Sequence, residues 1–210
     1  MELRIGNKVA PGFFAWKIPL GDDTVRYGLC VVPGSGNASA YLQQMLKDEG
    51  IDPKSKNIAR FGGKIPIGYR TSTVGERTLL IGDAASQVKP VSGGGLAPIL
   101  NIAPVLCDTV REAYDNNLFT KAVLGQYEVN WRRMMQPVID SGLKMRKRFC
   151  SLSDRDMNRV GEIFDTPNVR EHLANIDIDN PAEIARRIIS ERGIKSKLAM
   201  AFLKAKIWKE

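Results

Sequence analysis

The hydrophobic pattern of the first fifty residues predicts a β-hairpin followed by a helix. Aromatic and β-branched residues fill two runs, 13–20 and 24–32, which flank the turn sequence Gly21-Asp22-Asp23. Apolar positions then recur at helical spacing through residues 38–48, and Gly50 supplies a stop signal. The chain therefore opens with mixed strand and helix structure.

Two weaker strand patterns follow the first helix. Residues 57–68 have the composition of an irregular strand that Gly62 and Gly63 interrupt. Residues 76–82 predict a short buried strand that ends at Gly82, and a helix is expected from near Gly94 to about residue 116.

From residue 120 onward the pattern is helical. An apolar stripe covers residues 123–139, within which Pro137 predicts a kink. Further helix starts are predicted by N-cap and first-turn residues at Ser153 with Asp156 and at Asn180, Pro181 and Glu183, and a last helix is expected over residues 194–208. The fold class is thus α+β, with an all-helical C-terminal region.

Composition and charge indicate which kinds of binding partner and which cellular compartment to expect. The net charge of +8 favours anionic partners, and the three cysteines are too far apart in sequence to suggest a disulfide framework or a zinc site. No apolar run has the ~20 residues of a membrane span, and no signal peptide is recognisable. We expect a cytoplasmic protein with no bound metal and no nucleic-acid partner. The lysines of the last helix either contact an anionic membrane surface or face solvent.

One glycine pair imitates a dinucleotide-binding turn. Gly34 and Gly36 follow a strand and precede a helix, as in a GxGxxG motif, but the third glycine position holds Ser39. The preceding strand is predicted to pair in a hairpin, and the segment after the helix reads as a loop. We interpret the pair as a flexible strand-to-helix turn.

The segment TLLIGDAASQVKPVSGGGLAPIL, residues 78–100, contains the residues that suggest a ligand-binding site. Asp83 follows a strand, where a carboxylate can accept hydrogen bonds from the hydroxyls of a sugar or ribityl chain, and Gly82 permits close backbone approach. Pro90 stiffens the loop. The glycines Gly93, Gly94 and Gly95 then present backbone N–H groups at a helix start, which suits an anionic or electron-rich ring edge.

This segment resembles the second flavin-binding motif of FAD-dependent oxidoreductases with the p-hydroxybenzoate hydroxylase-type fold, and most of all that of the geranylgeranyl reductases. The resemblance implies that Asp83 contacts the ribityl chain of FAD and that Gly93 to Gly95 lie against the isoalloxazine ring. It covers about residues 9–160. The prolines Pro98 and Pro104 depart from the family pattern and predict a kinked or delayed helix.

A second match concerns the substrate. The reductases carry an aromatic-x-Trp-x-aromatic-Pro segment that lines an isoprenoid cavity, and Phe14, Trp16 and Pro19 match it, whereas Ile18 is aliphatic. Phe14 and Trp16 are equally compatible with an ordinary strand core, because aromatic residues are favoured in strands.

The resemblance implies three parts and one absence. Residues 1–76 would be the end of a substrate-binding sheet, residues 77–118 the second flavin-binding strand, loop and helix, and residues 119–210 the helical C-terminal region. The nucleotide-binding GxGxxG half of the family does not occur in these residues. We therefore expect a C-terminal fragment, a split gene product or a truncated reading frame that by itself binds FAD weakly or not at all.

The implied activity is the flavin-dependent reduction of prenyl-chain double bonds in isoprenoid lipids, with electrons from an external donor. No proton donor is assigned, since Tyr27 and Cys30 fit a strand core and Cys107 fits buried helix packing. Two alternatives stay open: a flavin monooxygenase or quinone-linked dehydrogenase, and a non-catalytic remnant that binds a lipid or a partner.

Overall fold

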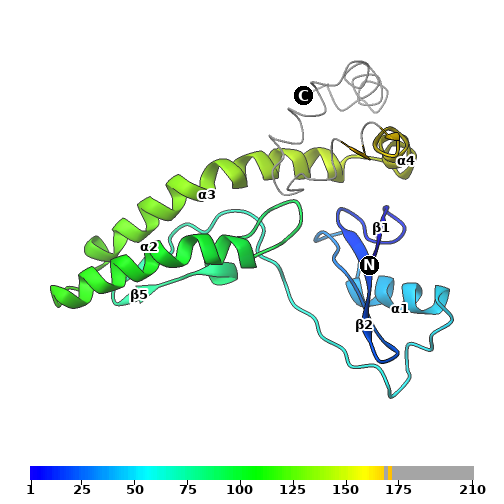
Figure 1. The fold of residues 1–210 in the computed structure, drawn as a ribbon, viewed down its shortest axis with the longest axis horizontal. Coiled ribbons are helices and arrows are strands. Elements are labelled where there is room, and N and C mark those ends of the chain that lie inside the picture. The colour runs from blue at the N-terminus through cyan, green and yellow to red at the C-terminus, as the bar shows by residue number, and fades with distance from the viewer. Residues whose placement is uncertain (168–169, 172–210) are drawn as a thin grey trace. The chain divides into compact units, whose positions relative to one another are not determined.

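The computed structural model describes residues 1–167, 170 and 171 (Figure 1). It is an α+β fold, as the sequence predicts, and its contacts divide it into two units. One unit contains residues 1–62 and the described residues from 146 onward. The other contains residues 63–145. The segment boundaries at residues 76 and 118 remain predictions.

The first unit is built on a three-stranded antiparallel sheet in the order β1-β2-β3. The predicted hairpin is confirmed as β2 (Phe14–Gly21) and β3 (Thr24–Leu29), joined by a turn in which Asp22 and Asp23 have positive φ angles. The strand β1 (Glu2–Ile5) pairs with β2 and was not predicted. Its short run offered too few alternating positions to stand out.

The helix α1 (Ala38–Asp48) covers one face of this sheet. Asn37 caps its first turn by accepting a hydrogen bond from the Ser39 N–H, as expected of an Asx residue at this position. Ala15 of β2 and Met45 of α1 form the buried core of the unit with Ala10.

The helix α4 (Asp154–Phe164) belongs to the same unit. Ser153 is its N-cap and accepts from the Asp156 N–H, which confirms the predicted capping pair. The start of α4 is held to the loop after β1, because the Asn7 N–H donates to Asp154 at 2.6 Å and its side-chain amide donates to the Leu152 carbonyl at 2.9 Å.

The second unit consists of two long helices and a short two-stranded sheet. Helix α2 (Leu96–Asp115) and helix α3 (Lys121–Cys150), whose last residues belong to the first unit, enclose a core of Ile102, Tyr127, Trp131, Met135 and Ile139. The strands β4 (Val74–Gly75) and β5 (Thr78–Leu79) pair antiparallel, and the 3-10 helix η1 (Gly82–Ala85) follows.

Two strand predictions need correction. Residues 57–68 form no strand, because Pro66 and the two glycines leave no continuous ladder of donors and side chains. The strand expected over residues 76–82 contains only Thr78 and Leu79. The helix expected from near Gly94 begins at Leu96, with Pro98 in the first turn, where no N–H is needed, and it continues through Pro104.

The predicted helix starts at residues 180 and 194 lie outside the described residues. Gly34 and Gly36 both have positive φ angles, after an antiparallel strand and before the N-cap of α1. They form a turn, which confirms that they are not a dinucleotide-binding motif.

Candidate functional site

Gly82 brings the Gly-Asp loop into direct contact with α2. It is buried, has a φ angle of 67°, and a Cβ at this position would lie 2.7 Å from Cδ1 of Ile99. Both its backbone conformation and its packing therefore require glycine. The sequence predicted close approach at Gly82, and the structure shows that the approaching group is a helix of the same chain.

Asp83 lies at the start of η1 with its carboxylate exposed. Its Oδ1 atom would be 2.7 Å from a Cβ on Gly95, so the carboxylate rests against the first residue before α2. Among the residues that the structure describes, none donates a hydrogen bond to this carboxylate. It is thus accessible to hydroxyl donors from a ligand.

The triple glycine closes a compact loop. The Gly93 N–H donates to the Lys89 carbonyl at 2.8 Å and the Lys89 N–H donates to the Gly94 carbonyl at 3.0 Å. The Gly94 N–H donates to Oγ of Ser92 at 3.3 Å. These N–H groups are engaged within the loop, which corrects the expectation that Gly93 and Gly94 present bare donors.

The start of α2 keeps donors that the helix itself cannot satisfy. Gly95 is the N-cap and has no side chain to cap the first turn, so the N–H groups of Leu96 and Ala97 lack an intrahelical acceptor. Leu96 is 80% exposed, which leaves this helix end open. A helix N-terminus with its partial positive charge favours an electron-rich ligand edge.

Pro90 fastens the same loop to α3. It is fully buried, and a Cβ on Gly142 would lie 2.8 Å from its Cδ. The absence of a side chain at Gly142 lets the ring pack against the helix backbone. Pro90 thus acts through this packing contact as well as through its fixed φ angle.

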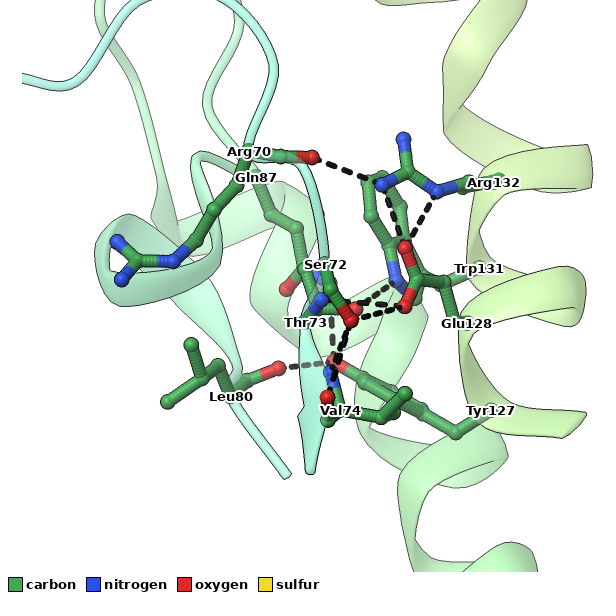
Figure 2. A network of polar contacts seen from close by, with 10 residues as sticks. All are labelled: Arg70, Ser72, Thr73, Val74, Leu80, Gln87, Tyr127, Glu128, Trp131 and Arg132. Atoms are coloured by element: carbon green, nitrogen blue, oxygen red, sulfur yellow. Dashed lines mark hydrogen bonds and ion pairs between the residues drawn. The ribbon is translucent and has the colours of Figure 1, made fainter. Parts of the chain in front are cut away.

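A buried amide side chain, that of Gln87, connects the Gly-Asp loop to α3, and Figure 2 shows its contact with Tyr127. Gln87, which is fully buried, accepts from the Gly82 N–H at 2.8 Å and donates to the Tyr127 hydroxyl at 2.9 Å. Tyr127 in turn donates to the Leu80 carbonyl at 2.7 Å. No signal in the sequence pointed to Gln87, because its partner Tyr127 lies far away along the chain.

Residues of α3 next to Tyr127 also hold Ser72 and Thr73, which precede β4 (Figure 2). Glu128 accepts from the Thr73 N–H and the Ser72 hydroxyl, both at 3.1 Å, and pairs with Arg132 at 2.5 Å. Burial raises the pKa of Glu128, but these hydrogen bonds outweigh it and bring the pKa below its ordinary value. The Trp131 indole N–H also donates to the Thr73 hydroxyl, at 2.8 Å.

The predicted substrate residues lie in the first unit. Phe14 and Trp16 are half-buried on the face of β2 opposite the buried Ala15, with ring centroids 5.9 Å apart. The Trp16 side chain lies over Gly28, its partner on β3, where a Cβ would be 2.3 Å from the indole. Pro19 is exposed. Phe14 and Trp16 are therefore not part of the packed core of this sheet.

Three residues were considered as proton donors, and the structure describes the surroundings of each. Tyr27 packs against the core beside α1 and its hydroxyl donates to Glu49 at 3.3 Å. Cys30 is half-buried, and burial raises its pKa above the ordinary value. Cys107 is exposed on α2, which corrects its expected burial. No helix among the described residues has the length and apolar content to cross a membrane.

Comparison with known proteins supplies relatives. No protein-family profile matches the chain. It is 28% identical over 196 residues to a digeranylgeranylglycerophospholipid reductase of Methanocaldococcus jannaschii, covering 91% of this chain and 48% of the relative. It is 29% identical over 160 residues to a second such reductase from Methanococcoides burtonii, covering 74% of this chain and 39% of the relative.

A solved structure shares the fold. The crystal structure of a geranylgeranyl bacteriochlorophyll reductase-like protein from Thermoplasma acidophilum superimposes with a TM-score of 0.73 at 18% identity, over 95% of this chain and 50% of that one. The chain spans about half the length of the curated relatives it matches. The relatives confirm the predicted resemblance to the geranylgeranyl reductase family.

Proposed function

We propose that this chain, which is similar to digeranylgeranylglycerophospholipid reductases over most of its length, supplies the flavin-ring end of an FAD-dependent reductase. The proposed substrate is a prenyl chain of an isoprenoid lipid. The observation that carries the proposal is the exposed Asp83 carboxylate set against Gly95 at the uncapped start of α2.

The residues present fit the ribityl and ring portions of FAD. The Asp83 carboxylate suits the ribityl hydroxyls, because it is exposed and lacks a donor among the described residues. Gly95 has no side chain that would displace the Asp83 carboxylate, and the first turn of α2 supplies unsatisfied N–H groups for an electron-rich ring edge. Pro90 and Gly82 fix the two ends of this cradle to α3 and α2.

When bound, the flavin would supply the hydride that reduces an isolated double bond, and an external donor would reduce the flavin. The residues of this chain would bind and orient the flavin and the prenyl substrate. Asp83 would fix the ribityl chain, and Phe14 and Trp16 would offer apolar aromatic surface to a prenyl chain. Peripheral contact with an anionic membrane and a cytoplasmic location are part of the same proposal.

The proposal is tested by titrating the purified chain with riboflavin and with FAD and following flavin fluorescence. Because the site holds the ring and ribityl end, both ligands should bind with similar and modest affinity. Asp83→Ala should abolish binding of both. A folded wild-type chain that binds neither ligand would overturn the proposal that this chain by itself forms a flavin site, and would leave a non-catalytic lipid- or partner-binding role.

Activity is tested separately. Flavin-loaded chain, reduced chemically under anaerobic conditions, is mixed with a geranylgeranyl lipid, and saturation of the prenyl chain is followed by mass spectrometry. A monooxygenase would instead insert oxygen when air is admitted. Oxygenated product without any saturated product would therefore replace the reductase with that alternative.

A further inference from the structure

We propose that Gln87 is a positioning residue that sets the backbone at Gly82 and Asp83 for the ligand, through a hydrogen-bonded chain that ends on Tyr127. This inference rests on the proposed flavin function and deepens it. Neither Gln87 nor Tyr127 is placed to touch a ligand directly, since both are fully buried. They act through the loop.

The first step is the hydrogen bond on Gly82. Its N–H lies in a buried position and donates to the side-chain oxygen of Gln87 at 2.8 Å, while its carbonyl accepts from the Gln87 N–H at 3.0 Å. Gln87 therefore holds both polar groups of the glycine that precedes Asp83. A buried N–H without an acceptor is costly, so the loop conformation depends on this amide.

The second step is the orientation of the amide itself. An amide side chain can flip, and only one orientation places its oxygen toward Gly82. The Tyr127 hydroxyl decides this orientation, because it donates its hydrogen to the Leu80 carbonyl and so accepts from the amide nitrogen of Gln87. Tyr127 thereby links Leu80, which precedes the Gly-Asp loop, to Gln87, which follows it.

The third step is the position of Asp83. With Gly82 fixed on both sides and unable to carry a Cβ beside Ile99, the chain leaves Gly82 in one direction. That direction places the Asp83 carboxylate against Gly95. The hydrogen-bonded chain Gln87–Tyr127–Leu80, which Figure 2 shows, therefore controls the distance between the Asp83 carboxylate and the start of α2.

The test compares Gln87→Met with Trp131→Phe in the full chain. Methionine keeps the length of the side chain and removes its hydrogen bonds to Gly82 and Tyr127, while the backbone hydrogen bond from Gln87 to the Gly82 carbonyl stays. Trp131→Phe is the matched control, because it removes another buried side-chain hydrogen bond of α3, to the Thr73 hydroxyl, in which neither Gly82 nor Gln87 takes part. The probe is riboflavin, and the second readout is hydrogen exchange at the Gly82 amide.

We expect Gln87→Met to weaken riboflavin binding about tenfold and to speed Gly82 exchange by a similar factor, as loss of the one side-chain hydrogen bond that reaches Gly82 predicts. Tyr127→Phe should shift both readouts in the same direction by a smaller factor. Trp131→Phe should lower the unfolding midpoint without changing either. Wild-type binding and exchange in Gln87→Met, at the reduced stability of the control, would overturn the inference.

The two proposals fail separately. If the wild-type chain binds no riboflavin, the flavin proposal fails, and Gly82 exchange then decides the role of Gln87. Faster exchange in Gln87→Met but not in Trp131→Phe supports control of the loop by Gln87. Equal exchange in the two variants refutes it.

Discussion

Oδ1 of Asp83 occupies the space that a side chain on Gly95 would need, since a Cβ there would lie only 2.7 Å away. The two residues are brought together by the loop that Pro90 fastens to α3 and by the contact of Gly82 with α2. The carboxylate and the helix start thus form one unit of structure, and any change at Gly95 is a change in the position of the carboxylate.

Gly95→Ala should therefore displace the Asp83 carboxylate and weaken flavin binding about tenfold, with little loss of stability. The backbone at Gly95 is already in the right-handed helical region, so alanine causes no backbone strain there. The measurement is a riboflavin titration together with a thermal unfolding curve, and the order-of-magnitude effect follows from the loss of one charge-assisted hydrogen bond.

The matched control is Gly125→Ala, the same substitution on α3 and outside the predicted flavin residues. A Cβ at Gly125 would meet no atom within 4 Å. Riboflavin affinity should stay within about twofold of wild type, as expected for a change away from the carboxylate. Equal losses in both variants would mean that the contact between Asp83 and Gly95 does not set the affinity.

Asp83→Ala should abolish retention of flavin while leaving the fold intact. The side chain is exposed and accepts no hydrogen bond from a described residue, so its removal leaves no buried group unsatisfied. Flavin content after gel filtration and far-ultraviolet circular dichroism measure the two effects. Flavin content equal to wild type would remove Asp83 from the site.

Trp16→Ala should slow turnover of long prenyl substrates while flavin loading persists. The side chain is half-buried, on the face of β2 opposite the packed Ala15, so an apolar ligand has access to it. The measurement is the dependence of rate on prenyl chain length. Kinetics equal to wild type would leave Trp16 a purely structural residue.

Gly28→Ala provides the structural counterpart of that variant. The new Cβ would meet the Trp16 indole at 2.3 Å, and overpacking of this kind costs about 1–3 kcal/mol. In the double variant with Trp16→Ala the clash is gone, so the two stability losses should not add. Additive losses in chemical unfolding would show that the indole does not lie over Gly28.

Much of the fold was predictable because its signals are local. The hairpin around Asp22 and Asp23, helix α1 and the Ser153 cap of α4 were all predicted from spacing and turn chemistry. Such elements can be recognised from a few consecutive residues. Strands β1 and β4 were missed because a strand of two to four residues carries almost no periodicity.

The candidate site was predictable in part. The sequence identified Asp83 and the triple glycine as ligand residues, and that assignment remains a prediction. The sequence did not reveal that the N–H groups of Gly93 and Gly94 are engaged within the loop. The backbone hydrogen bonds between Lys89 and these glycines depend on loop geometry, which residue types alone do not specify. Gln87 was missed for a similar reason, since its role comes from Tyr127, forty residues later in sequence.

A charge cluster in the first unit gives a prediction about pH. The Glu49 carboxylate, just after α1, accepts from Arg4, from Lys17 at 2.5 Å and from the Tyr27 hydroxyl at 3.3 Å. The hydrogen bonds from Lys17 and then Arg4 lower the pKa of Glu49 to about 2, from an ordinary value of 4.5. The cluster joins all three strands of the sheet to the end of α1.

Glu49→Gln should therefore destabilise the protein at neutral pH and not in strong acid. A carboxylate whose pKa is lower in the folded state stabilises that state above the unfolded value, near 4.5, and loses its contribution as the pH falls toward about 2. The free energies of unfolding of the variant and the wild type should thus differ at pH 7 and converge across this window. Asp48→Asn is the control, because Asp48 lies on the same helix end and accepts only from the neutral Gln44 amide among the described residues, so its effect at pH 7 should be small. A difference for Glu49→Gln that stays constant from neutral pH down to about pH 2 would show that the charge of Glu49 does not hold the sheet to α1, and that the side chain contributes by packing alone.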